Sequence, residues 1–227
     1  MSSFNRTAKL WRLVILIAFF SASNFALARY LGDSVAARRT PFDFDGDGKA
    51  DISVFRPSDR TWYLNQSTNG LSATQFGLST DKITPADYDG DGKTDIAVFR
   101  EGVWYLQRST AGFTGIAFGD GNDIPQPADF DGDGKADLAL WRPSNGTWFV
   151  LNLVNNQSNA FQFGASEDKP VVADYDGDGK ADYAVFRPSN GTWYYSAKHA
   201  PDLRQCSSAT RKTNLFRRIT TATVKPI

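Results

Sequence analysis

The acidic residues of this chain are concentrated in four nearly identical nonapeptides, such as DYDGDGKAD at residues 174–182. Counted from the first aspartate, positions 1, 3, 5 and 9 are aspartate in every copy, and positions 4 and 6 are glycine. Carboxylates at alternate positions of a tight loop converge on one point, where they raise each other's pKa unless a cation neutralises them. Ca²⁺ accepts six to eight oxygen ligands. We therefore predict one calcium ion in each loop, about four in the chain.

The predicted ligands are the four aspartates of each loop and the backbone carbonyl of the lysine at position 7, with a water completing the shell. The full set is Asp43, Asp45, Asp47, Lys49 and Asp51; Asp87, Asp89, Asp91, Lys93 and Asp95; Asp129, Asp131, Asp133, Lys135 and Asp137; and Asp174, Asp176, Asp178, Lys180 and Asp182.

Two other interpretations of the loops stay open, and a third is excluded. Mg²⁺ prefers fewer protein ligands and more water than Ca²⁺, and metal-free acidic turns would need no ion at all. An EF-hand requires a bidentate glutamate at position 12 and helices on both sides. Strand-like segments flank these loops instead, and position 12 is apolar in every copy, namely Val54, Val98, Leu140 and Val185.

The loops mark a repeat that organises most of the chain. Their first aspartates are 44, 42 and 45 residues apart, a period typical of propeller blades, and the units start near residues 41, 83, 125 and 170. Each unit contains four short segments rich in β-branched and aromatic residues, separated by turn residues. In the third unit these segments are residues 125–130, 136–144, 146–153 and 159–164. We predict an all-β, propeller-like array of about four four-stranded blades, the last one incomplete.

Aromatic and arginine positions recur in step with the loops. A solvent-facing tryptophan row could stack on sugars, whereas a buried row would form the core between blades, with each arginine over an aromatic ring. The tryptophans are Trp62, Trp104, Trp148 and Trp193, and the arginines are Arg56, Arg100, Arg142 and Arg187. Recurrence in every unit favours the core.

The pattern DxDGDGxxD followed by VFRPSxGTW resembles the FG-GAP/VCBS-type repeats, the calcium-loop blades of integrin α-subunit propellers and of related secreted bacterial proteins. The resemblance covers about residues 41–196. It implies that each loop joins two strands of a blade and that positions 1, 3, 5 and 9 ligate calcium. The family commonly closes rings of about seven blades, whereas four units are legible here, so the resemblance does not establish a closed ring.

Both ends of the chain differ from the repeats. Residues 1–28 have the cationic segment, the short apolar core and the small residues before a cleavage site that are typical of a signal peptide, although an uncleaved anchor is the alternative. A linker is expected over residues 29–40. We therefore expect a secreted, periplasmic or cell-surface protein without a stable membrane span after cleavage.

Residues 197–227 form a basic tail that does not continue the repeat. Codons for DYDGDGKAD, read one base later, can encode ITTATVKPI, which are the last nine residues of the chain. The correspondence extends back to Ser207 and there matches the segment QFGASEDKPVVA at residues 162–173. We predict that the tail is frameshifted and disordered, that blade four therefore lacks its outer strand, and that the chain is a fragment of a longer array.

Charge and composition restrict the function. Residues 29–196 carry 15 basic and 24 acidic residues, so a nucleic-acid-binding surface is not indicated. The only histidine, His199, lies outside the repeats, so a histidine-based triad within them is excluded. We expect no enzyme but a binding or adhesion module for a glycan or an extracellular protein. The alternatives are the scaffold of a secreted polysaccharide hydrolase or lyase, or a non-functional fragment, and incomplete blades could associate with each other.

Overall fold

The computed structural model describes residues 40–196 and the backbone of residues 204–207. The predicted signal peptide, residues 29–39 of the linker and most of the basic tail lie outside the described residues. All described residues belong to one compact unit, residues 40–227. In this part of the chain no helix has the length and apolar character needed to cross a membrane.

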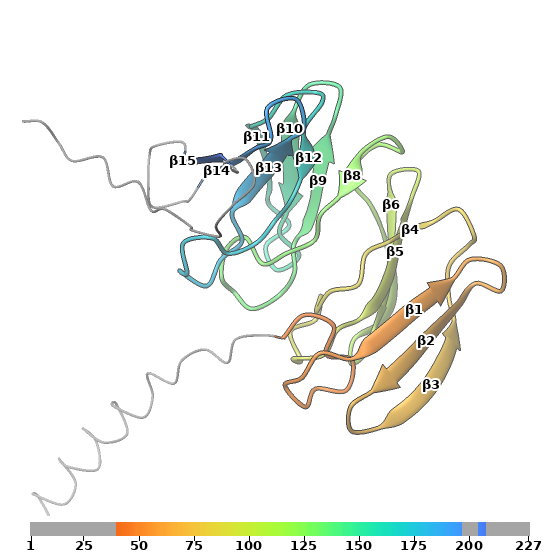
Figure 1. Cartoon of the computed structure of the whole chain (residues 1–227). Coiled ribbons are helices and arrows are strands. Elements are labelled where there is room, and N and C mark those ends of the chain that lie inside the picture. The colour runs from red at the N-terminus through yellow and green to blue at the C-terminus, as the bar shows by residue number, and fades with distance from the viewer. Residues whose placement is uncertain (1–39, 197–203, 208–227) are drawn as a thin grey trace, which may run out of the picture. The chain divides into compact units, whose positions relative to one another are not determined.

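The described residues form four antiparallel sheets joined by turns and loops (Figure 1). The first sheet has the strands β1 (Ile52–Arg56), β2 (Thr61–Gln66) and β3 (Gly70–Gln75). The second has β4 (Lys82–Ile83), β5 (Ile96–Arg100), β6 (Val103–Arg108) and β7 (Gly112–Ala117). The third has β8 (Ile124–Pro125), β9 (Leu138–Arg142), β10 (Thr147–Leu151) and β11 (Ser158–Gln162). The fourth has β12 (Lys169–Pro170), β13 (Tyr183–Arg187), β14 (Thr192–Ser196) and β15 (Arg204–Ser207). The all-β prediction is confirmed.

In the second, third and fourth sheets the acidic loop connects the short first strand to the long second strand. In the second sheet the Asp95 N–H donates to the Ala86 carbonyl at 2.8 Å, which closes the loop as a hairpin between β4 and β5. The first loop closes in the same way, from the Asp51 N–H to the Phe42 carbonyl at 2.7 Å. Among the described residues, however, no strand precedes β1, so the first sheet has three strands.

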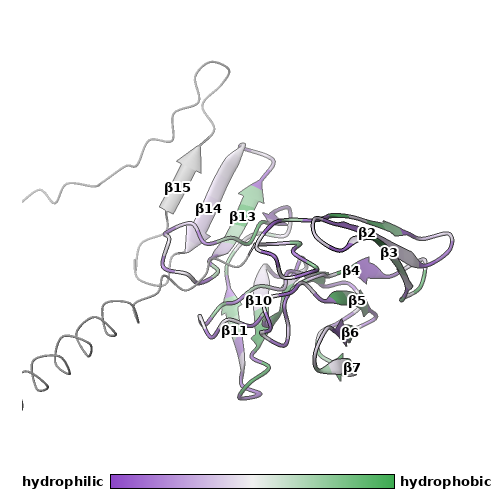
Figure 2. Ribbon diagram, turned by 90° about the horizontal axis from the view of Figure 1, so that it is seen from below, coloured by the Kyte–Doolittle hydropathy of each residue, from purple (hydrophilic) through white to green (hydrophobic). Residues whose placement is uncertain are grey.

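The second strand of a sheet is apolar on both faces where sheets lie on both sides of it. All four residues of β5 from Ile96 to Phe99 are buried, and β5 is coloured as hydrophobic in Figure 2. Such continuous apolar runs are typical of strands covered on both faces. The turn after β5 consists of two residues with positive φ, Glu101 and Gly102, as a type I′ hairpin turn requires. This short turn explains why the second unit is shorter than the others.

The fourth sheet differs from expectation at its outer edge. Instead of ending at β14, it continues with β15, and Ser207 pairs with Thr192 just as Gln162 pairs with Thr147 in the third sheet. The unpaired N–H and C=O groups of a strand edge can accept the backbone of a segment whatever its side chains are. The predicted frameshift itself lies mostly outside the described residues and stays a prediction.

The hydrophobic core lies between consecutive sheets. Four clusters of buried side chains join the first sheet to the second, the second to the third and the third to the fourth. Trp62, Trp104 and Trp148 are fully buried in these clusters, so the core interpretation of the tryptophan row is confirmed for them. Trp193 is exposed, because no sheet follows the fourth one in the described chain.

Candidate metal sites in the acidic loops

The aspartate at position 1 and the two glycines fold each loop. In the second loop the Asp87 carboxylate accepts the N–H of Gly90 at 2.7 Å on one oxygen and the N–H of Gly92 at 2.9 Å on the other. Both glycines have a positive φ, 83° and 89°, which residues with a side chain rarely adopt. The same bonds recur in the other loops. The glycines are therefore needed for the turn itself.

In the first and second loops the aspartates at positions 9 and 3 attach the loop to the last hairpin turn of its sheet. Asp95 is buried, and its two oxygens accept the N–H groups of Tyr88 at 2.9 Å and Ser109 at 2.6 Å. One oxygen of Asp89 accepts the N–H groups of Thr110 at 3.0 Å and Ala111 at 2.8 Å. Backbone donors thus hold both side chains in place.

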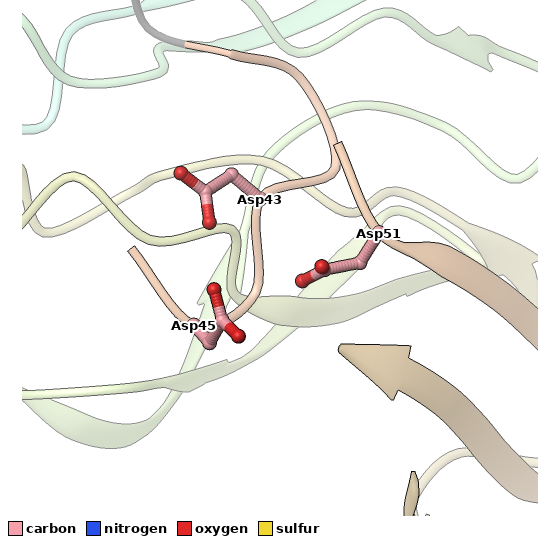
Figure 3. A group of neighbouring side chains, drawn as sticks. All are labelled: Asp43, Asp45 and Asp51. Atoms are coloured by element: carbon pink, nitrogen blue, oxygen red, sulfur yellow. The ribbon is translucent and has the colours of Figure 1, made fainter. Parts of the chain in front are cut away.

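The carboxylates at positions 1, 3 and 9 lie together in all four loops. In each group the three residues offer oxygen atoms that all lie within 4.8 Å of one another. Figure 3 shows the side chains of the first group turned toward one another. The groups are Asp43, Asp45 and Asp51; Asp87, Asp89 and Asp95; Asp129, Asp131 and Asp137; and Asp174, Asp176 and Asp182.

The carboxylates of one loop also affect each other's ionisation. The pKa of Asp137 is raised to about 7, mainly by burial and further by the neighbouring carboxylates of the same loop, led by Asp131, although the hydrogen bond from the Phe130 N–H opposes the shift. Burial also raises the pKa of Asp95 and of Asp182, with a smaller contribution from the position-3 aspartate of each loop. In the second loop Asp89 Oδ1 is buried and has no hydrogen-bond partner. A cation would relieve both the repulsion and the unpaired oxygen.

The donor set therefore fits a hard cation. Three carboxylates from one loop offer oxygen ligands only, which suits Ca²⁺ or Mg²⁺ rather than metals that prefer nitrogen or sulfur. Bound there, the ion would supply positive charge and tie the loop to the start of the second strand.

The aspartates at position 5 lie outside all four groups, so their role as ligands stays a prediction. Asp91 Oδ2 instead accepts the hydroxyl groups of Ser109 at 2.6 Å and Thr110 at 2.5 Å. Burial opposes the effect, but these hydroxyl bonds lower the pKa of Asp91. Asp47 makes the same contacts with the Ser-Thr pair at residues 67–68. The Ser-Thr pair that occurs in both hairpin turns could have predicted these hydrogen bonds from the sequence.

The lysines at position 7 have a side-chain contact that the sequence did not reveal. Lys93, Lys135 and Lys180 each lie over the position-4 glycine of the preceding loop. Lys49, in the first loop, has no preceding loop and pairs with its own Asp47 at 3.1 Å. The proposed carbonyl ligation at position 7 stays a prediction.

A second buried carboxylate system, missed in the sequence, lies at the arginine that ends the second strand. We call it the arginine–aspartate clamp. The guanidinium binds both oxygens of an aspartate that is 19 residues earlier, at 2.6–2.9 Å. The pairs are Arg100 with Asp81, Arg142 with Asp123 and Arg187 with Asp168. The constant spacing of 19 residues between the aspartate and the arginine was the sequence signal for these pairs. Arg56 has no such partner, because residue 37 is alanine.

The stacking predicted for the arginines is confirmed in every sheet. Each guanidinium carbon lies 4.5–4.7 Å from the centre of an aromatic ring on the neighbouring third strand. The partner rings are Tyr63, Tyr105, Phe149 and Tyr194.

Comparison with known families agrees with the loop geometry. The FG-GAP-like repeat family matches residues 43–98 and 129–185, which begin at the first and third loops. A search of curated proteins gave no significant match.

Solved structures with a similar fold include a lectin of Agrocybe aegerita, described as recognising non-reducing terminal N-acetylglucosamine. It is 20% identical, with a TM-score of 0.52, over 70% of this chain and 49% of that one. BBS1N, solved in complex with ARL6DN, is 15% identical, with a TM-score of 0.47, over 71% of this chain and 54% of that one. The chain thus spans about half the length of these structures, and the likeness shows the fold alone.

Proposed function

Because the chain belongs to the FG-GAP-like repeat proteins, we propose that it is an exported, calcium-stabilised binding module whose ligand is a glycan. The observation that carries the calcium part is the convergence of three carboxylates in each of four loops, with a buried, unpartnered oxygen on Asp89. Export is proposed from the signal-like residues 1–28. Calcium is abundant outside the cytoplasm, so the two parts agree.

Calcium would act on stability rather than on a reaction. Four Ca²⁺ ions would add eight positive charges to residues 29–196, which carry 15 basic and 24 acidic residues. Because the carboxylates converge in the folded loop and are not held together in the unfolded chain, the ions bind the folded state preferentially and stabilise it.

The glycan part rests on a cavity between the third and fourth sheets. It measures about 460 Å³ and is lined mainly by Phe161, Phe163, Tyr194 and Arg187, together with Gln162 and Val185. Aromatic walls with a few fixed polar groups are typical of small-molecule sites. Asp168 holds the Arg187 guanidinium in position at 2.7 Å, so the charged group is preorganised. The lectin with a similar fold supports the choice of a sugar.

A glycan array probed with the full chain, in calcium and in EDTA, tests this function. We expect binding to defined sugars in calcium and its loss in EDTA. Phe161→Ala should abolish binding without unfolding the protein, whereas Phe113→Ala, a matched change of an exposed phenylalanine on an outer strand, should leave binding intact. Binding that survives Phe161→Ala would assign the ligand to another surface.

Catalysis is not part of the proposal. The buried aspartates of the loops recur in every repeat, whereas an active site is usually one asymmetric pocket. Incubation of the chain with the polysaccharides that it binds, followed by reducing-end and ultraviolet assays, checks this point. Depolymerisation would show a hydrolase or lyase and overturn the proposal of a binding module.

A further inference from the structure

Consecutive sheets of this chain pack through one repeated interface with two different sides. We call the side of a sheet that faces the preceding sheet its leading face, and the side that faces the following sheet its trailing face. Val98 lies on the leading face of the second sheet and packs against Trp62 on the trailing face of the first. Leu140 and Trp104 make the equivalent pair between the second and third sheets.

Main-chain hydrogen bonds fix the register of this interface. The N–H at loop position 8 donates to the carbonyl at position 1 of the preceding loop. The bonds are Thr94 to Asp43 at 2.6 Å, Ala136 to Asp87 at 2.7 Å and Ala181 to Asp129 at 2.7 Å. Because only backbone atoms take part, any copy of the loop can follow any other.

The position-7 lysine adds a steric match. Lys93 lies over Gly46, where a Cβ atom would come within 3.1 Å of its side chain, and Lys180 lies over Gly132 at 2.9 Å by the same measure. A glycine at position 4 therefore makes room for the lysine of the following sheet.

The two ends of the described array carry the unused halves of this interface. On the leading face of the first sheet Val54 is 57% exposed, whereas its equivalent Val98 is 0% exposed. Ile52 and Leu71, on the same face, are also exposed. On the trailing face of the fourth sheet Trp193 is 39% exposed and Tyr175 is 40% exposed, while their equivalents in the other three sheets are buried.

The polar parts of the interface are unused at the same two ends. Nothing lies within 4 Å of a Cβ built on Gly177, the position-4 glycine of the fourth loop, and the Lys49 side chain is 71% exposed. Within the described residues, neither the Ala50 N–H nor the Asp174 carbonyl has the partner that its equivalents have.

We propose that the trailing face of the fourth sheet binds the leading face of the first sheet of a second copy of this chain. The occupant is a second copy because the two faces are complementary halves of the interface already present three times within the chain. In this pairing Val54 covers Trp193, Lys49 covers Gly177, and the Ala50 N–H donates to the Asp174 carbonyl. The self-association is independent of any glycan.

The pairing is head to tail. One such contact between two copies leaves the leading face of one copy and the trailing face of the other still uncovered. A head-to-tail interface either closes into a ring or continues as a filament. Two copies bring eight sheets together, and propellers typically have four to eight blades. A closed dimer with two identical interfaces is therefore the expected product.

Sedimentation velocity of the full chain in calcium tests the proposal over a range of concentrations. We expect a dimer that dissociates on dilution. Val54→Asp and Trp193→Glu should each raise the dissociation constant by at least about 30-fold, as expected for central apolar residues of an interface. Val154→Asp is the matched control, because Val154 is 60% exposed but lies in the turn between β10 and β11.

Mixing the two variants separates head-to-tail pairing from the alternatives. Val54→Asp keeps an intact trailing face and Trp193→Glu an intact leading face, so the mixture should form a heterodimer although neither variant pairs alone. Circular dichroism of each variant checks that it is folded. A wild-type chain that stays monomeric at all concentrations, or a Trp193→Glu variant that dimerises as well as the wild type, would overturn the proposal.

Discussion

The second, third and fourth sheets each bury carboxylates at two places, the arginine–aspartate clamp and the acidic loop, and the surroundings of the carboxylates differ between them. In the clamp of the third sheet, Asp123 is 0% exposed and both of its oxygens bind the Arg142 guanidinium. In the acidic loop of the same sheet, Asp137 is 2% exposed and its neighbours are other carboxylates. Two buried aspartates in one sheet therefore have opposite electrostatic surroundings.

The difference shows in the direction of the pKa. In the fourth sheet, burial opposes the effect, but the Arg187 hydrogen bonds lower the pKa of Asp168 below its ordinary value. In the acidic loop of that sheet, burial and the carboxylate of Asp176 raise the pKa of Asp182. The clamp carries its own cation, whereas under our proposal the loop takes one from solution. Burial alone does not separate a structural carboxylate from a metal ligand, but the charge of its neighbours does.

Removal of calcium should produce the largest effect, because it acts on all four loops together. An ion at 100 times its Kd stabilises the folded chain by about 2.7 kcal/mol per site, and EDTA removes this contribution. We expect a large fall in the unfolding midpoint on chelation and its recovery on addition of calcium. Differential scanning calorimetry measures both. An unchanged midpoint would show that calcium does not stabilise the fold.

Arg142→Leu should produce the next largest effect, because it leaves Asp123 buried without its cation. Breaking a buried pair in this way costs about 3 kcal/mol. Arg56→Leu is the matched control. The Arg56 partner, Asp59, is 39% exposed in its side chain, and so the change should have little effect on urea unfolding. Equal losses in the two variants would contradict the role assigned to the clamp.

A smaller effect of pH should follow from the clamp in the fourth sheet. A lowered pKa of Asp168 in the folded state means that its contribution is present above the ordinary value of about 3.9. The contribution is lost as pH falls through the lowered folded pKa. In Arg187→Leu the same carboxylate stays buried without its cation, so burial raises its pKa there. The difference in unfolding free energy between the parent and Arg187→Leu should therefore be largest near pH 7 and shrink as the pH falls toward 4 and below. If the difference grows at low pH, the ionised Asp168 carboxylate does not stabilise the folded chain through Arg187.

The smallest effect should separate two aspartates of one loop. Asp89→Asn removes a member of the carboxylate group and should weaken calcium binding by the second loop. Asp91→Asn removes only the acceptor of two hydroxyl groups and should cost about 1 kcal/mol of stability with little change in affinity. Isothermal titration calorimetry and urea unfolding of both variants test this. If Asp91→Asn weakens calcium binding as much as Asp89→Asn does, the aspartate at position 5 is also a ligand.

Much of the fold could be predicted because it repeats. The turn residues and the alternation of apolar residues each occur four times at a constant period. A pattern that arises by chance would appear in one repeat only and can therefore be set aside. The burial of Trp62 and the stacking of Arg100 on Tyr105 followed from their recurrence. Local pattern and repeat geometry point to the same structure there.

What the sequence did not reveal depends on contacts between repeats or on the direction of a side chain. Alternation along the loop predicted that Asp91 is a ligand, but it did not reveal the hydrogen bonds that Asp91 accepts from Ser109 and Thr110. The contact of Lys93 with Gly46 joins two units, so no pattern within one unit reveals it. The outer strand β15 depends on the backbone of β14 rather than on the side chains of residues 204–207.

The bond from Thr94 to Asp43 and its two equivalents also bear on how such a chain can grow by gene duplication. Since the linkage between neighbouring sheets uses backbone atoms together with a glycine and a lysine that every copy of the loop contains, a duplicated segment brings both halves of its own connection with it. No compensating substitution is needed elsewhere. The number of repeats in such proteins can therefore change in single steps while the sequence of each repeat stays the same.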